Sequence, residues 1–219
     1  MPRKGGMGLK QSERQERSRA RILEAAAQEF AKLGCESVTV DGICAGYGIS
    51  KGMMYHYFSG RDDLFLHCVE AVFGRLRARL EPLLESTDFL DVSAAVRGFF
   101  AERERYFADR PVEKAIFENA LFRTPRGLEE RISELHVPLE ELNREFMRRL
   151  TERLEPRQGC TREEIQRYLE AVSAAYKTLL DGFAGEYGVT SVESMVSSCG
   201  RLVELLLFGI VEKSGTPVK

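Results

Sequence analysis

Apolar residues recur at helical spacing along almost the whole chain, and no segment sustains the alternation of apolar and polar residues that marks a strand. One such stripe contains Ile22, Ala26, Phe30 and Leu33. Residues three or four positions apart share one face of an α-helix, whereas a half-buried strand requires a period of two. The spacing therefore predicts an all-α protein. Its 219 residues, 43% of them hydrophobic, provide enough core for one large domain or two small ones.

Capping pairs and prolines divide these stripes into separate helices. A Ser or Thr followed three residues later by Glu or Gln can cap a helix start reciprocally. The chain has three such pairs, Ser12 and Gln15, Thr161 and Glu164, and Thr190 and Glu193. Pro138 lies within the stripe of a long helix, which it either opens or kinks.

The block from Val40 to Tyr57 reads as two short helices joined by a tight turn. Thr39 and Ser50 are suitable N-caps for the two helices. Gly48 suits the positive φ that the turn requires. Two short helices with a glycine-containing turn are typical of a helix-turn-helix, whose second helix enters the DNA major groove. An ordinary helical hairpin is the alternative interpretation.

The second short helix has two chemically different faces. Met54, Tyr57 and Phe58 share one face by spacing and are predicted to pack inward. The opposite face carries residue types that suit phosphate contacts or close approach to base edges. These outward residues are Lys51, Gly52, Met53, Tyr55 and His56.

The segment VTVDGICAGYGISKGMMYHYFSGRDDLF, from Val38 to Phe65, resembles the DNA-binding head of the TetR/AcrR family of transcriptional regulators. The resemblance covers about residues 13–70. It implies an N-terminal three-helix helix-turn-helix DNA-binding domain, followed by a C-terminal helical bundle that binds a ligand and dimerises, with about nine helices. The expected divisions are a disordered basic tail over 1–12, the DNA-binding domain over 13–60 and the bundle over 61–219, with a bridging helix from 61.

The same resemblance implies a repressor that binds a palindromic operator as a homodimer and is released by a small-molecule effector. An activator on the same fold remains an alternative, as does a carrier or sensor that does not bind DNA. The predicted DNA contacts are Thr39, Ser50, Lys51, Gly52, Met53, Tyr55, His56 and Arg61.

The remainder of the chain has no comparable motif, so its candidate sites rest on helical position alone. Aromatic residues, and polar residues among apolar neighbours, are candidates for the lining of a pocket, although plain core or surface positions are the alternative for each. The pocket candidates are Phe100, Phe117, Asn119, Leu121, Phe146, Tyr176 and Lys177. The wide apolar stripes of the last two helices predict a dimer interface. Its candidates are Tyr176, Phe183, Leu202, Leu206 and Ile210. The effector is expected to be apolar or amphipathic.

Charge is distributed unevenly along the chain. Residues 1–60 contain nine basic and six acidic side chains, a net charge of +3. The remaining residues hold 23 basic and 28 acidic side chains, which gives −5 within the total of −2. A basic head on an acidic body fits a protein that meets DNA with one end only.

Several other classes of protein are disfavoured. The sequence shows no paired carboxylates, catalytic triad or metal-ligand spacing, so we expect neither an enzyme nor a metal or other cofactor. Five scattered cysteines are typical of a reducing cytoplasm. The longest apolar stretch, 202–211, is interrupted by Glu204 and is shorter than the roughly 20 residues of a membrane span. No apolar segment follows the basic N-terminus, so no secretory signal or membrane partner is expected.

Overall fold

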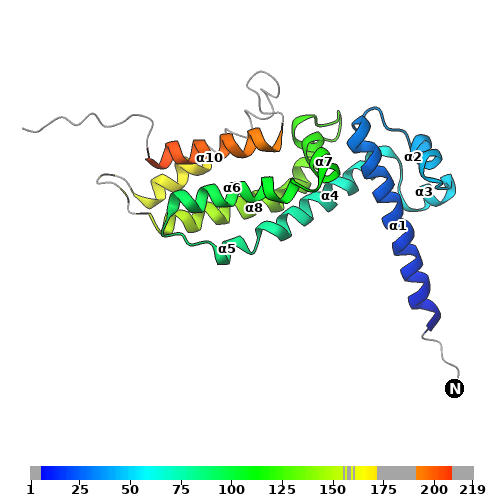
Figure 1. Cartoon of the computed structure of the whole chain (residues 1–219), viewed down its shortest axis with the longest axis horizontal. Helices are drawn as coiled ribbons and strands as arrows, with labels where there is room; N and C mark the ends of the chain where they lie inside the picture. Colours follow the sequence, from blue (N-terminus) through cyan, green and yellow to red (C-terminus); the bar gives the residue numbers. More distant parts are fainter. Residues whose placement is uncertain (1–5, 155, 157–158, 160, 172–190, 209–219) are drawn as a thin grey trace, which may run out of the picture. The chain divides into compact units, whose positions relative to one another are not determined.

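In a computed structural model of the chain, all the regular elements of the described residues are α-helices, which confirms the all-α prediction (Figure 1). The structure describes residues 6–154, 156, 159, 161–171 and 191–208. The helices are α1 (Gly6–Leu33), α2 (Val40–Tyr47), α3 (Lys51–Tyr57), α4 (Arg61–Leu80), α5 (Leu83–Ser86), α6 (Val92–Phe107), α7 (Pro111–Phe122), α8 (Glu129–Glu152) and α10 (Val192–Phe208). Residues 162–171 are also helical.

The chain divides into two compact units. The first unit comprises Met1–Gly74 and Arg110–His136, and the second comprises Arg75–Asp109 and Val137–Lys219. The first unit therefore contains α1, α2, α3 and α7, and the second contains α5, α6 and α10. The residues of α4 and α8 are shared between the units.

The core of the first unit forms around α1. Ile22, Ala26 and Phe30 are fully buried, as their spacing predicts, and the Phe30 ring meets Phe65 of α4 edge-on at 5.1 Å. Leu33 belongs to the same stripe but is exposed. The reason is that α1 ends there, where Gly34 takes the left-handed conformation with φ 75°, so the last turn no longer faces the core.

The N-terminus of α1 differs from the sequence prediction. The helix begins at Gly6, ahead of the start that the Ser12–Gln15 pair predicts, so Ser12 lies inside the helix and does not cap it. The reason is cooperativity: once a helix is nucleated, adding each further residue costs little, and Leu9, Lys10 and Gln11 are good helix formers. Residues 1–5 lie outside the described part.

The two other capping pairs have different outcomes. The Thr161 amide donates to Glu164 Oε2 at 2.9 Å and the Glu164 amide donates to Thr161 Oγ1 at 3.1 Å, which confirms that capping box. At α10 the reciprocal cap is made by Ser191 and Ser194, whose amides each donate to the other's hydroxyl at 3.2 Å. Thr190 of the predicted pair with Glu193 lies outside the described residues.

Pro138 lies inside α8 and does not open it, since the helix starts at Glu129.

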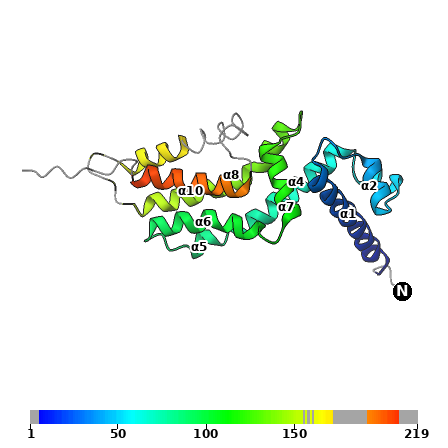
Figure 2. The same cartoon turned by 45° about the horizontal axis from the view of Figure 1, so that its top comes forward.

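In the second unit, α10 packs along α6, as Figures 1 and 2 show. Phe99 of α6 stacks face to face on Phe146 of α8, with 3.8 Å between ring centroids. These stacked aromatic rings form the centre of the second unit's core.

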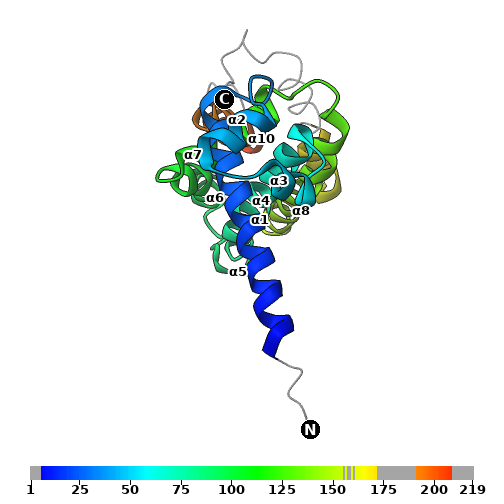
Figure 3. The same ribbon diagram turned by 90° about the vertical axis from the view of Figure 1, so that its right-hand side faces the viewer.

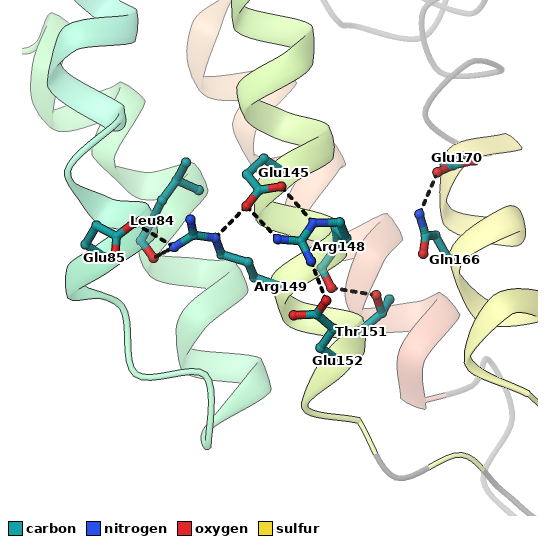
Figure 4. Close-up of polar contacts among 9 residues, drawn as sticks. All are labelled: Leu84, Glu85, Glu145, Arg148, Arg149, Thr151, Glu152, Gln166 and Glu170. Atoms are coloured by element: carbon teal, nitrogen blue, oxygen red, sulfur yellow. Dashed lines mark hydrogen bonds and ion pairs between the residues drawn. The ribbon is translucent and has the colours of Figure 1, made fainter.

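A network of ion pairs joins α5 to α8 within the second unit (Figure 4). Arg149 donates to Glu145 at 2.6 Å and to Glu85 at 3.0 Å. Arg148 donates to Glu145 at 2.8 Å and also pairs with Glu152. Hydrogen bonds from Arg148 and Arg149 lower the pKa of Glu145 to about 2.

The left-handed turn at Gly48 predicts a position-specific effect of alanine in α2. Gly48 has φ 61°, which costs an L-residue about 1–2 kcal/mol. Gly48→Ala is therefore expected to lower the free energy of unfolding by about that amount, measured by urea titration. Gly46→Ala is the matched control, since it lies in the helix with open space around it and should stabilise by about 0.5–1 kcal/mol. Equal effects of the two changes would contradict this account.

The Glu145 network predicts a pH-dependent effect on stability. Because the pKa of Glu145 is lower in the folded state, its contribution is present above the unfolded pKa of about 4.3 and is lost as pH falls toward 2. We expect Glu145→Gln to cost about 0.5–1 kcal/mol at pH 7 and only a small part of that at pH 2, where about half of the folded molecules have Glu145 protonated. Glu141→Gln, on an exposed part of the same helix, is the control. A cost that is the same at both pH values would count against the network.

Candidate nucleic-acid interface

The turn between α2 and α3 is built by two caps and one glycine, as predicted. Thr39 Oγ1 accepts a hydrogen bond from the Gly42 amide at 3.0 Å, and Ser50 Oγ accepts one from the Met53 amide at 3.2 Å. Gly48 ends α2 in the left-handed conformation. The two helices therefore pack against each other beside α1 (Figure 3).

Long-range contacts attach this pair to α1. The Arg21 guanidinium donates to the Tyr47 carbonyl at 2.9 Å, and the Tyr47 hydroxyl donates to Glu29 at 3.0 Å. The Arg19 guanidinium lies 5.4 Å from the centre of the Phe58 ring. Arg14 and Arg17 are exposed nearer the start of α1. Of these four arginines, two therefore hold the helix-turn-helix against α1 and two face solvent.

The exposed face of α3 carries the residues that the spacing assigns to it. Met54 and Phe58 are buried, whereas Lys51, Gly52, Tyr55 and His56 are exposed and Met53 is half-buried. The His56 ring lies edge-on to Tyr57, with 4.8 Å between ring centroids. The arrangement presents an ammonium, a phenol and an imidazole on one surface.

Lys51 is paired with a carboxylate that the sequence reading overlooked. Its Nζ donates to Asp41 of α2 at 2.8 Å, and both side chains are exposed. The hydrogen bond from Lys51 to Asp41 raises the pKa of Lys51. The pair lies ten positions apart in the sequence, so no local spacing rule reveals it. Asp41 competes with any phosphate for the same ammonium group.

Thr39 and Arg61 line a common surface depression of about 520 Å³, together with Val38, Ser59, Gly60, Asp62 and Asp63. Arg61 Nε donates to Asp62 at 2.8 Å and Arg61 Nη1 donates to the Glu36 carbonyl at 3.3 Å. The hydrogen bond to Asp62 raises the pKa of Arg61. The structure thus brings these two predicted phosphate contacts together, with the Arg61 side chain held in place.

Two of the predicted pocket residues lie together in the second unit. Phe100 and Phe146 both contact Phe99, at 5.7 Å and 3.8 Å between ring centroids. Tyr176 and Lys177 lie outside the described residues.

The three pocket candidates of α7 belong to the first unit. Asn119 is buried and its amide donates to the Phe30 carbonyl at 3.4 Å, which links α7 to α1. Phe117 packs edge-on against Phe73 at 5.7 Å, and Leu121 is half-buried. In this structure Asn119 and Phe117 take part in packing within their own unit.

The predicted dimer interface is only partly described. Leu202 is half-buried on α10. Leu206 lies in the same helix, with its side chain outside the described part. Tyr176, Phe183 and Ile210 also lie outside the described residues, so the interface stays a prediction.

Two observations bear on metal and thiol chemistry in the described part of the chain. No cluster of three or more His, Cys, Asp or Glu side chains occurs there that could hold a metal ion. Burial raises the pKa of the Cys35 thiol to about 11, which keeps it protonated and unreactive at neutral pH. Among the same residues, no helix is long and apolar enough to cross a membrane.

The known proteins that the chain resembles in sequence are transcriptional regulators. Residues 22–68 match the family model described as "Bacterial regulatory proteins, tetR family". The chain is 22% identical over 196 residues to the HTH-type transcriptional regulator YdgC of Bacillus subtilis, covering 90% of this chain and 94% of that protein. It is 33% identical over 69 residues to the HTH-type transcriptional repressor KstR2 of Mycobacterium tuberculosis, covering 32% of this chain and 34% of that protein.

Solved structures share the fold. The fatty acid degradation regulator FadR of Bacillus halodurans superposes with a TM-score of 0.63 at 16% identity, covering 90% of this chain and 97% of that one. The FadR of Bacillus subtilis in complex with stearoyl-CoA gives 0.59 at 15% identity, covering 88% and 99%. Together with the capped helix-turn-helix of α2 and α3, these matches show that residues 22–68 belong to the tetR family of bacterial regulatory proteins and that the chain shares the fold of solved TetR-family regulators.

Proposed function

We propose that this protein is a repressor that binds a palindromic operator as a homodimer and leaves it when a small-molecule effector binds. The observation that carries the proposal is the exposed face of α3, where Lys51, Tyr55 and His56 stand on a helix held by two caps and a left-handed glycine. A packing-only hairpin has no need of this set of side chains on its solvent face.

In the proposed complex, α3 lies in the major groove. Lys51, Tyr55 and His56 contact phosphates, and so do Thr39 and Arg61 from the depression beside α4. Gly52 permits close approach to base edges, and Met53 meets an apolar base edge such as a thymine methyl. Ser50 keeps its capping role at the start of α3. In functional terms, residues 13–60 form the DNA-binding domain and residues 61–219 the ligand-binding and dimerisation domain.

A palindromic operator has two half-sites, so two DNA-binding domains are needed to occupy it. They must stand about 34–36 Å apart to enter successive major grooves on one side of the duplex. An effector that binds better to a conformer with another spacing lowers operator affinity by its differential affinity, typically about 1–3 kcal/mol. The dimer is proposed to form through the last helices, with Tyr176, Phe183, Leu202, Leu206 and Ile210 in the interface.

The relatives supply independent support for this scheme. KstR2 is a repressor by name, and the FadR of Bacillus subtilis holds stearoyl-CoA in its crystal structure. We therefore propose an apolar or amphipathic effector, bound near Phe100 and Phe146 of the second unit. The family is one of transcriptional regulators, so the proposal includes no catalytic step, and its place of action is the cytoplasm, where operator DNA lies.

The primary test is selection of bound duplexes from random DNA with the full-length protein. The selected sequences should contain two inverted half-sites whose centres lie about one helical turn apart. With that duplex, Lys51→Ala and Tyr55→Phe should each weaken binding about fivefold or more and Lys51→Ala should reduce the salt dependence, since a phosphate contact is lost. Affinity is measured by fluorescence anisotropy over a range of salt concentrations.

The matched control for Lys51→Ala is Lys32→Ala. Both lysines are 61% exposed and each is paired with one acidic side chain, but Lys32 lies on α1 and is not a proposed DNA contact. Its substitution should leave DNA affinity within about twofold. Equal losses in the two variants, or selection of a single unpaired half-site, would refute the proposed interface.

The Lys51–Asp41 ion pair generates a further prediction. Asp41→Asn removes the carboxylate that competes with phosphate for Lys51, so DNA affinity should rise about threefold to tenfold at low salt. The gain should largely disappear in the Lys51→Ala background, which a double-mutant cycle measures. A gain of the same size in both backgrounds would show that Asp41 acts through general charge repulsion and not through Lys51.

A further inference from the structure

Arg103 is a buried cation in the middle of α6. Only 5% of its surface is exposed, although long basic side chains almost never lie fully inside a protein unless an acidic group pairs with them. It belongs to the second unit, to which the proposed function assigns the effector.

The groups around its guanidinium are neutral. Nη1 donates to the Phe99 carbonyl at 3.1 Å, and Nη2 donates to the side-chain oxygen of Asn143 on α8. The guanidinium carbon lies 4.6 Å from the centre of the Phe99 ring and 5.4 Å from that of Phe100. Within the described ranges, no carboxylate forms an ion pair with Arg103.

The neighbouring residue in the sequence shows the opposite situation. Glu102 is equally buried, at 5% exposure, but its carboxylate accepts hydrogen bonds from Arg79 and Arg105 at 2.7 Å each. Two adjacent charges on one helix are therefore buried side by side, one with two partners of opposite charge and the other with none among the described residues.

Burying a cation of this kind costs folding free energy, and a residue that served only to fill the core would not incur that cost. A buried charge without a counter-ion is strongly disfavoured, and an apolar residue of similar size often does as well or better in a purely structural role. Burial lowers the pKa of Arg103 to about 10, and a coulombic interaction with the Cys199 side chain partly opposes this shift. The guanidinium therefore stays charged at neutral pH.

We propose that Arg103 is the anion-binding group of the effector site, and that the effector is an apolar or aromatic molecule carrying a carboxylate. A guanidinium presents five N–H donors in a planar fork that matches a carboxylate, and the two bonds to Phe99 and Asn143 leave donors for it. The rings of Phe99 and Phe100 provide the apolar side of the site. Phe100 is half-buried, and a β-carbon added to Gly200 of α10 would lie 4.0 Å from the Phe100 ring, so a ligand there meets both α6 and α10.

This inference rests on the proposed function for its biological meaning, but it is tested without DNA. The full-length protein is titrated with octanoate, decanoate, dodecanoate and phenylacetate, and with the matching alcohols, while its melting temperature and the heat of binding are recorded. We expect at least one acid to raise the melting temperature and to bind about tenfold or more tightly than its alcohol. If no acid binds, or if acid and alcohol bind equally well, the proposal is overturned.

Variants identify the residue responsible. Arg103→Met should weaken binding of that acid about tenfold or more and leave the affinity for the alcohol unchanged, and Arg103→Lys, which keeps the charge but loses the fork, should lie between. Arg105→Met is the matched control, because Arg105 is exposed and its partner is Glu102; acid binding should not change. Unaltered acid binding in Arg103→Lys and Arg103→Met would also overturn the proposal.

Ligand-free stability separates this role from a structural one. If Arg103 is kept for an anion, Arg103→Met should melt at the same temperature as the wild-type protein or higher. A clear loss of melting temperature would show instead that Arg103 serves as a cross-link between α6 and α8. Failure of the regulator proposal would be recognised separately, as absence of operator selection by a wild-type protein that still distinguishes acid from alcohol.

Discussion

Helices α2 and α3, of eight and seven residues, are too short to be stable in isolation. They are helical because Ile43, Met54 and Phe58 are buried in the core of the first unit and because the caps of Thr39 and Ser50 satisfy backbone donors that would otherwise lack partners. The Arg21 bond to the Tyr47 carbonyl holds the end of α2. The position of every proposed DNA contact on α3 depends on this anchoring.

The same anchoring explains why the exposed face of α3 can be varied independently of the fold. Lys51, Tyr55 and His56 contribute little to the core, so their chemistry is free to serve recognition. The Lys51–Asp41 pair is exposed on both sides and is therefore weak and sensitive to salt. Such a pair moderates the positive charge of the interface without fixing its geometry.

Charges inside the second unit follow a different physical rule. The dielectric constant is low there, so each buried charge needs a partner or a function. The buried carboxylate of Glu102 accepts hydrogen bonds from Arg79 and Arg105. By contrast, the ion pairs of Glu145 that join α5 to α8 lie nearer the surface. Arg103 lacks such a partner in the described part of the chain. This difference between neighbouring residues is why we propose a ligand-binding function for Arg103 and not for Glu102.

Local spacing in the sequence determined the all-α class, the caps at Thr39, Ser50 and Thr161, and the division of α3 into a buried and an exposed face, because these depend on residues within about four positions of one another. Helix starts were less predictable. The start of α1 differs from expectation, since good helix formers extend that helix toward the N-terminus. Only the tertiary structure decided the pairing of Lys51 with Asp41, the bond from Asn119 to the Phe30 carbonyl, and the burial of Arg103 beside neutral groups. Each of these depends on how helices distant in the sequence pack together, and no periodicity within a single helix encodes that packing.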